Sequence, residues 1–224
     1  MTERSVALLR IAAGATVSAV IGYAYGLRIA VGDANPFDYF GYFTNLTCLL
    51  ACIVLIVTGA LTLGRQRVPD DVVLCRGLTT ACLLVVGVVY NVLVPGTGSA
   101  PPWVSVILHI VFPLLVLADW TLFGDRPSLA WQRLWLVLSY PAVWIVVVLI
   151  RGATDGWVPY GFLLPERGTA SLIAHIALLL AALMAAGSLV WALSRQPGIG
   201  LRRAVRQYGD RDTPIRRAVP HRVE

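Results

Sequence analysis

Hydrophobic residues make up 58% of the 224 residues, charged residues make up only 13%, and the mean hydropathy is +0.75. Soluble domains are typically about 45–50% apolar and about 25% charged, so this composition excludes an ordinary soluble domain and indicates an integral membrane protein. The net charge of +6 comes entirely from arginine, much of it within residues 195–224. Membrane lipids are therefore the expected partner, and nucleic acid is not.

Apolar runs interrupted by charged residues or by Pro and Gly predict six transmembrane helices. Each run is close to the roughly 20 residues that cross the ~30 Å hydrocarbon core of a bilayer. The predicted segments are residues 5–29, 43–63, 72–94, 103–123, 132–150 and 169–193. The predicted fold is therefore an all-α, polytopic membrane domain over residues 1–194, followed by a basic tail, residues 195–224, that we expect to be disordered.

The first segment is expected to remain as a membrane anchor, because its apolar core is longer than that of a signal peptide and no clear cleavage site follows. Arginines near the segment ends gather on one side of the predicted membrane: Arg4, Arg10, Arg65, Arg67, Arg126, Arg133 and those from Arg195 onward. The other side carries fewer arginines, accompanied by acidic residues. By the positive-inside rule both termini are predicted to be cytoplasmic, in a multi-pass protein of the inner (plasma) membrane.

Thr44 lies where a polar loop gives way to the second apolar segment, and thus in the first turn of the predicted helix. At a helix N-terminus the first backbone N–H groups have no helical partner and the macrodipole is positive. A threonine at this position can cap the helix, or it can act as a nucleophile with oxyanion-stabilising donors beside it. The residue pattern leaves both interpretations open.

Several polar side chains share one predicted depth in the membrane. With a helical rise of about 1.5 Å per residue, His109 and His175 lie roughly 10 Å below the outer surface and Asn91 roughly 6 Å. Thr44 and Asn45 enter from the same side. Polar groups in hydrocarbon are costly unless they face a bundle interior or a cavity, so their common depth predicts one internal site open toward the outer leaflet. Taken singly, a histidine or asparagine here is equally explained by hydrogen bonding between helices.

The loop between the fifth and sixth segments, residues 151–162, is rich in aromatic residues, which is typical of a membrane interface. Arg151 is a candidate for binding a carboxylate or phosphate headgroup, with Trp157 and Tyr160 at the mouth of the site. Asp119 is predicted at the cytoplasmic end of the fourth segment, far from the histidines, and we interpret it as an interfacial or structural acid.

A series of short motifs runs along the chain: Tyr42-Phe43-Thr44, Leu108-His109 with Pro113, Asp119-Trp120, Tyr140-Pro141, Arg151-Gly152, and Gly156-Trp157 with Pro159-Tyr160 and Phe162. In their order and spacing they resemble the bacterial Pr6Pr family of membrane proteins, over roughly residues 5–195. That family is related to the androgen-induced and androgen-dependent membrane proteins of animals, which are hydrolases that cleave fatty acid esters of hydroxy fatty acids with a threonine and a histidine. The resemblance implies that Thr44 is the nucleophile and His109 the catalytic histidine.

The chemistry that the resemblance implies suits these residues. A threonine hydroxyl needs an adjacent base, which neutral His109 can provide if the second and fourth segments pack together. Backbone amides at the start of the second segment, helped by Asn45 or Asn91, would stabilise the oxyanion, and water would release the acyl-threonine. His175 has no role in the resemblance, and we assign it to the lining of the site.

Two other classes of function stay open. His109 and His175 could bind haem b between them, which would make the chain an electron-transfer protein. Alternatively, the polar layer could receive a headgroup in a noncatalytic lipid-binding or small-molecule transport protein. Outside the haem alternative no cofactor or metal is expected, because the cysteines lie in apolar runs and match no zinc or redox spacing: Cys48, Cys52, Cys75 and Cys82.

Overall fold

The computed structural model describes residues 2–96 and 100–198, and every regular element in these ranges is helical. The elements are α1 (Glu3–Ala30), α2 (Pro36–Gly41), α3 (Phe43–Leu63), α4 (Asp70–Leu93), α5 (Pro102–Val106), the π-helical turn η1 (Ile107–Val111), α6 (Phe112–Leu122), the 3-10 helix η2 (Trp131–Leu138), α7 (Ser139–Thr154), the 3-10 turns η3 (Gly161–Leu163) and η4 (Pro165–Arg167), and α8 (Thr169–Leu193). Six stretches in these ranges are long and apolar enough to cross a membrane, which confirms the predicted all-α, multi-pass class. Most of the predicted basic tail, residues 199–224, lies outside the described residues.

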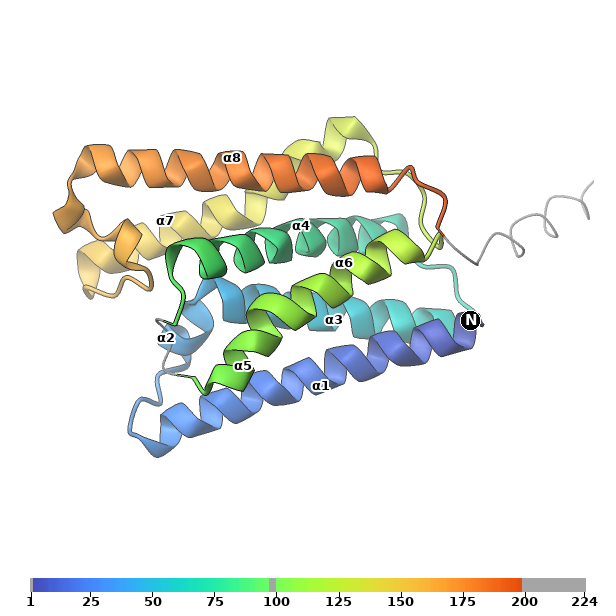
Figure 1. Cartoon of the computed structure of the whole chain (residues 1–224), viewed down its shortest axis with the longest axis horizontal. Helices are drawn as coiled ribbons and strands as arrows, with labels where there is room; N and C mark the ends of the chain where they lie inside the picture. The colour runs from blue at the N-terminus through green and yellow to red at the C-terminus, as the bar shows by residue number, and fades with distance from the viewer. Residues whose placement is uncertain (1, 97–99, 199–224) are drawn as a thin grey trace, which may run out of the picture.

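The long helices lie side by side in one bundle (Figure 1). α1 packs along α3, while α4 contacts α3, α6 and α8. The start of α1 and the end of α8 lie at one end of the bundle, which we call the ion-pair end because Arg10 and Asp119 meet there. α2 and the loop between α7 and α8 lie at the opposite end, which we call the cavity end.

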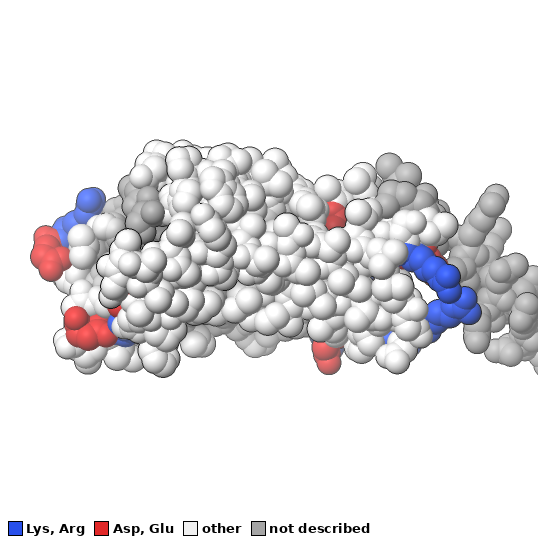
Figure 2. Space-filling model, turned by 90° about the horizontal axis from the view of Figure 1, so that it is seen from below, with Lys and Arg blue, Asp and Glu red and all other residues white. Residues whose placement is uncertain are grey.

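The middle of the bundle is suited to lipid. Figure 2 shows one face of the molecule on which charged side chains gather toward the two ends, with a broad uncharged stretch between them. Within the six candidate membrane segments, between 22% and 50% of the residues in the most apolar window are buried inside the protein. The remainder is largely apolar surface, which a hydrocarbon layer can cover while the helices satisfy their own backbone hydrogen bonds.

Glycine allows α1 and α3 to approach closely. A Cβ added at Gly14 would lie 2.9 Å from the carbonyl oxygen of Cys52, and one at Gly59 would lie 2.7 Å from that of Ala7. Both distances are shorter than van der Waals contact, so a side chain at either position would collide with the backbone of the opposite helix. Small residues of this kind favour helix association in membranes, where lipid tails are as apolar as the helix surfaces and close packing decides.

The fourth membrane segment contains the π turn at His109. Pro113 lies four residues after His109 and has no N–H, so the His109 carbonyl lacks its usual helical donor. The side-chain amide of Asn91 on α4 donates to this carbonyl at 3.5 Å and to the Gly87 carbonyl at 2.7 Å. Proline and the cross-helix amide together account for the local widening of the helix, a feature common at functional sites.

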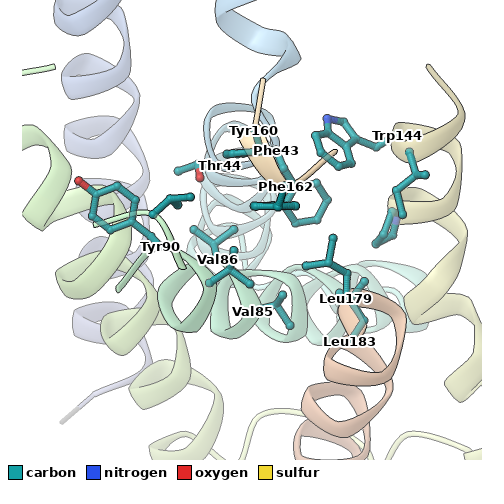
Figure 3. Close-up of a pocket in the computed structure, with 14 residues that line it drawn as sticks. Phe43, Thr44, Val85, Val86, Tyr90, Trp144, Tyr160, Phe162, Leu179 and Leu183 are labelled. Carbon is teal, nitrogen blue, oxygen red and sulfur yellow. The ribbon is translucent and has the colours of Figure 1, made fainter. Parts of the chain in front are cut away.

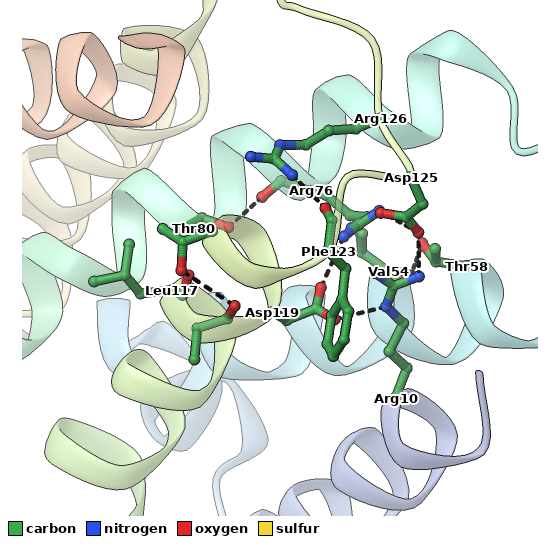
Figure 4. A network of polar contacts seen from close by, with 12 residues as sticks. Arg10, Val54, Thr58, Arg76, Thr80, Leu117, Asp119, Phe123, Asp125 and Arg126 are labelled. Atoms are coloured by element: carbon green, nitrogen blue, oxygen red, sulfur yellow. Dashed lines mark hydrogen bonds and ion pairs between the residues drawn. The ribbon is translucent and has the colours of Figure 1, made fainter. Parts of the chain in front are cut away.

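Four charged side chains form a cluster at the ion-pair end (Figure 4). Asp119 on α6 accepts hydrogen bonds from Arg10 of α1 at 2.7 Å and from Arg76 of α4 at 2.8 Å. Asp125, which follows α6, pairs with the same two arginines at 2.5 and 3.4 Å. Both arginine side chains are only 3% exposed, and their burial is possible because the two carboxylates neutralise them. The cluster ties three helices together and makes Asp119 a structural acid.

We expect Asp119→Asn to destabilise the bundle, because two buried arginines would then share one carboxylate. Removing one partner of a buried ion pair typically costs about 3–5 kcal/mol, so the midpoint of thermal unfolding in detergent should fall well below that of the wild type. Asp71→Asn is the matched control, since the Asp71 side chain is 92% exposed. An unchanged midpoint for Asp119→Asn would show that the cluster does not stabilise the bundle.

Candidate active site

A cavity of about 1010 Å³ opens at the cavity end of the bundle. Its walls come from the end of α1, the start of α3, the end of α4, α5 with the π turn, the loop before α8 and the second turn of α8. Five of the predicted site residues line it: Thr44, Asn45, His109, Tyr160 and His175. Tertiary structure therefore gathers polar side chains from three membrane segments and one loop around a single space.

A smaller pocket of about 50 Å³ adjoins this cavity (Figure 3). Its lining is almost entirely apolar and comes from α3, α4, α7, α8 and the loop before α8. The residues that line both spaces are Thr44, Tyr90, Val94, Tyr160 and Phe162. Thr44 therefore lies at the boundary between a large cavity with both polar and apolar walls and an apolar pocket that reaches toward the middle of the bundle.

Thr44 does not cap the helix. Tyr42 occupies the N-cap position of α3, its side chain makes no capping hydrogen bond, and Thr44 is the second helical residue. The first helical hydrogen bond runs from the Leu46 N–H to the Tyr42 carbonyl at 3.2 Å, so the preceding amides have no helical acceptor. The Thr44 side chain is 9% exposed, and Figure 3 shows its hydroxyl at the pocket wall. Of the two interpretations of this threonine, the structure excludes the N-cap.

The junction between α2 and α3 is held in place by three hydrogen bonds. Tyr39 of α2 donates to the Ile21 carbonyl of α1 at 2.9 Å. The side-chain amide of Asn45 donates to the Tyr39 carbonyl at 2.8 Å, and the Trp144 indole of α7 donates to the Gly41 carbonyl at 2.8 Å. These contacts fix the start of α3 against two other helices. They also commit one N–H of Asn45 to the backbone.

Both membrane histidines have the same hydrogen-bonding arrangement. His109 Nδ1 lies 2.9 Å from the Ser105 carbonyl oxygen, and His175 Nδ1 lies 2.8 Å from the Ser171 carbonyl oxygen, one turn earlier in each helix. Because a carbonyl oxygen only accepts, Nδ1 carries the proton in each ring and Nε2 of the neutral ring is available as a base. The His109 ring also stacks on Tyr90, with ring centroids 3.5 Å apart.

Three predicted site residues lie elsewhere, since Asn91, Arg151 and Trp157 line neither space. Asn91 is exposed and joins α4 to the π turn. Arg151 donates to Asp38 at 2.6 Å and to Asp155 at 2.7 Å, and its guanidinium lies 4.2 Å from the centroid of the Trp157 ring. These contacts anchor the loop before α8 to the α2 region, and neither Arg151 nor Trp157 lines the cavity.

Two arginines to which the sequence assigned no site role line the cavity, namely Arg28 and Arg167. Arg28 pairs with Asp33, which lines the cavity as well. The Arg167 side chain has no hydrogen-bond or ion-pair partner within residues 2–96 and 100–198. The cavity thus contains an uncompensated positive charge. The predicted depth of a residue could not identify these cavity-lining arginines, because depth does not tell which side chains face one another.

Comparisons of the chain with protein-family models, with curated proteins and with solved structures found no match in any of the three. The class of protein therefore follows from the structure itself. It is a multi-pass membrane protein with six candidate spanning segments, a polar cavity at one end of the bundle and an apolar pocket behind it. The family resemblance stays a prediction.

Arg151, in the last turn of α7, and Arg167, in the loop before α8, should differ in their effect on stability. Arg151→Gln removes two ion pairs and a ring contact at the surface, which we expect to cost about 1 kcal/mol and to lower the midpoint of thermal unfolding by about 2–4 °C. Arg167→Gln removes the same charge without breaking a hydrogen bond or ion pair among the described residues, and its midpoint should match the wild type. Equal midpoints for the two variants would contradict the anchoring role of Arg151.

Proposed function

We propose that the protein is an integral membrane hydrolase that cleaves a lipid or fatty acyl ester, with Thr44 as the nucleophile and His109 as the general base. The observation that carries this proposal is the position of Thr44 between the apolar pocket and the cavity. The carbons of an acyl chain next to its carbonyl would enter the apolar pocket and bring the ester carbonyl to the Thr44 hydroxyl, while the rest of the substrate would occupy the cavity. An apolar pocket beside a cavity with polar groups suits an amphipathic ester better than a water-soluble one.

The histidine geometry supports the same chemistry. A threonine hydroxyl is a weak nucleophile unless a base accepts its proton. His109 lines the cavity that Thr44 lines and keeps Nε2 unprotonated, because Nδ1–H is held by the Ser105 carbonyl. A fixed tautomer of this kind directs the basic nitrogen away from its own helix.

The proposed reaction has two steps. In the first, His109 Nε2 accepts the Thr44 proton as Oγ bonds to the ester carbonyl carbon, and the resulting oxyanion collapses when the alkoxide leaves with the proton from His109. In the second, water attacks the acyl-threonine, giving up its proton to His109, and the carboxylic acid departs as Thr44 recovers its proton. His175, with the same tautomer, lines the site.

The proposed orientation places this chemistry at the outer leaflet. Arginines near the segment ends are more frequent at the ion-pair end, so the positive-inside rule puts both termini in the cytoplasm and the cavity end outside. A membrane lipid would then reach the cavity without crossing the bilayer. We propose the inner (plasma) membrane as the location.

A fluorophosphonate probe tests the nucleophile. We expect the purified protein in detergent to form one adduct, mapped by mass spectrometry to Thr44. Thr44→Ala should abolish it, Thr44→Ser should retain it, and His109→Ala should slow its formation by about 100-fold or more, the usual contribution of a general base.

Thr47→Ala is the matched control for this experiment. Thr47 lies one turn further along α3, is fully buried, and its hydroxyl pairs with that of Tyr140 at 3.1 Å, so its loss should leave labelling unchanged. A folded wild-type protein that forms no Thr44 adduct would contradict the hydrolase. Copurified lipid without turnover would then favour the noncatalytic lipid-binding or transport function.

A bis-histidine haem protein is the second candidate. It is favoured by one observation, since His109 and His175 line one cavity and both keep Nε2 available as an iron ligand. The absorption spectrum of the purified protein separates the two functions. A Soret band that disappears in His109→Ala would favour haem, whereas its absence together with a Thr44 adduct would favour the hydrolase.

A further inference from the structure

The proposed reaction needs hydrogen-bond donors at the oxyanion, and the asparagines predicted for this role are engaged elsewhere. Asn91 lines neither the cavity nor the pocket, and its amide nitrogen donates to the Gly87 and His109 carbonyls. The amide of Asn45 donates one of its two N–H groups to the Tyr39 carbonyl. A further donor beside Thr44 would therefore complete the site.

Tyr160 is the side chain that the fold brings to this position. It lines both the polar cavity and the apolar pocket, as Thr44 does, and Figure 3 shows it beside Thr44 and Phe43 at the pocket. Its hydroxyl lies near the Thr44 hydroxyl and the backbone N–H groups of Thr44 and Phe43, whose influence opposes the rise in its pKa that burial causes. These are the amides that have no acceptor within α3 and no capping side chain.

The loop that carries Tyr160 is fixed against the start of α3. Trp157 packs closely on Gly41, since a Cβ added at Gly41 would lie 2.5 Å from the indole. The backbone N–H of Trp157 donates to the Asp155 carboxylate at 3.0 Å. Arg151 holds Asp155 and stacks on Trp157. The Tyr160 ring itself stacks on Phe162, with centroids 5.3 Å apart. The phenol is thus presented to Thr44 by a supported segment.

We infer that the Tyr160 hydroxyl donates the hydrogen bond that stabilises the oxyanion formed when Thr44 attacks the ester carbonyl. The amides at the start of α3 lie near the phenol oxygen and would orient its O–H toward the site. Through this contact the positive end of the α3 macrodipole acts on the oxyanion. No proton leaves Tyr160. The inference rests on the proposed hydrolase function and makes Tyr160 its third catalytic residue.

The phenol keeps its proton under working conditions. Burial raises the pKa of Tyr160 to about 12, and the opposing effect of hydrogen bonds from Thr44 leaves it above the ordinary value of 10. A group with this pKa stays protonated, and so remains a donor, at neutral pH. Tyr160 therefore acts without an ionisation step of its own.

Tyr160→Phe tests the inference, because it removes the hydroxyl and keeps the ring contacts. With p-nitrophenyl octanoate as the probe substrate, we expect kcat to fall about 100- to 1000-fold with little change in KM, as for the loss of one oxyanion donor. Tyr140→Phe is the matched control. The Tyr140 hydroxyl pairs with Thr47 and the residue lines neither space, so kcat should stay near the wild-type value.

A second measurement separates an oxyanion donor from a group that only supports α3. The thiono analogue of the substrate carries sulfur in place of the carbonyl oxygen, and sulfur accepts hydrogen bonds poorly. We expect the wild type to prefer the oxygen ester strongly and Tyr160→Phe to lose most of that preference. The ratio of the two rates does not depend on how much of each preparation is folded.

The outcomes distinguish a failure of the Tyr160 role from a failure of the hydrolase function. If the wild type labels at Thr44 and hydrolyses the ester, but Tyr160→Phe matches it in kcat and in the oxygen-to-sulfur ratio, the inference about Tyr160 is wrong and the hydrolase stands. A lower kcat with an unchanged ratio also overturns it, since Tyr160 then only supports α3. If the wild type neither labels nor hydrolyses, the hydrolase fails and the inference fails with it.

Discussion

Polar groups within a hydrocarbon layer have no water to bind, so each must find its partner inside the protein. At the ion-pair end this constraint brings two arginines and two carboxylates into one cluster that joins three helices. Neither Arg10 nor Arg76 could remain buried in its own helix without the carboxylates that α6 and the following residues supply. The packing of α1, α4 and α6 therefore depends on charge neutralisation as much as on apolar contact.

The same constraint operates at the cavity end, with a different result. Pro113 deprives the His109 carbonyl of its donor, and Asn91 replaces that donor from α4. The Ser105 carbonyl accepts a hydrogen bond from His109 Nδ1, and the Ser171 carbonyl accepts one from His175 Nδ1. Within residues 2–96 and 100–198, the second nitrogen of each ring and the first amides of α3 have no hydrogen-bond partner in the helices. Each of these groups belongs to a segment that forms the cavity wall.

The loop before α8 completes this end of the molecule. Arg151, Asp155 and Trp157 do not contact the cavity, yet they determine where Tyr160 lies relative to α3. A residue can thus support a site by positioning the segment that carries another residue. The motif around Trp157 contains both kinds of residue: Trp157 supports the loop, and Tyr160 lines the cavity. Under the proposed function, the hydroxyl of Tyr160 and the nucleophile would come from segments more than a hundred residues apart in the sequence.

The sequence by itself determined the class of protein and the six apolar segments, and it predicted the depth of the polar residues, because length and helical rise convert residue number into distance across a membrane. From this it placed Thr44, His109 and His175 in one layer, and the structure gathers them around one cavity. Only the tertiary structure decided which polar residues face the cavity: Asn91 is exposed, Arg151 is paired away from it, and Arg167 lines it with no ion-pair partner in the part of the chain that the structure describes. The physical reason is that lipid and protein interior are both apolar, so the hydrophobic pattern of a membrane helix carries little information about its rotation. Rotation is settled by side-chain packing and by partners distant in the sequence, such as Asp119 for Arg76, which no single segment reveals.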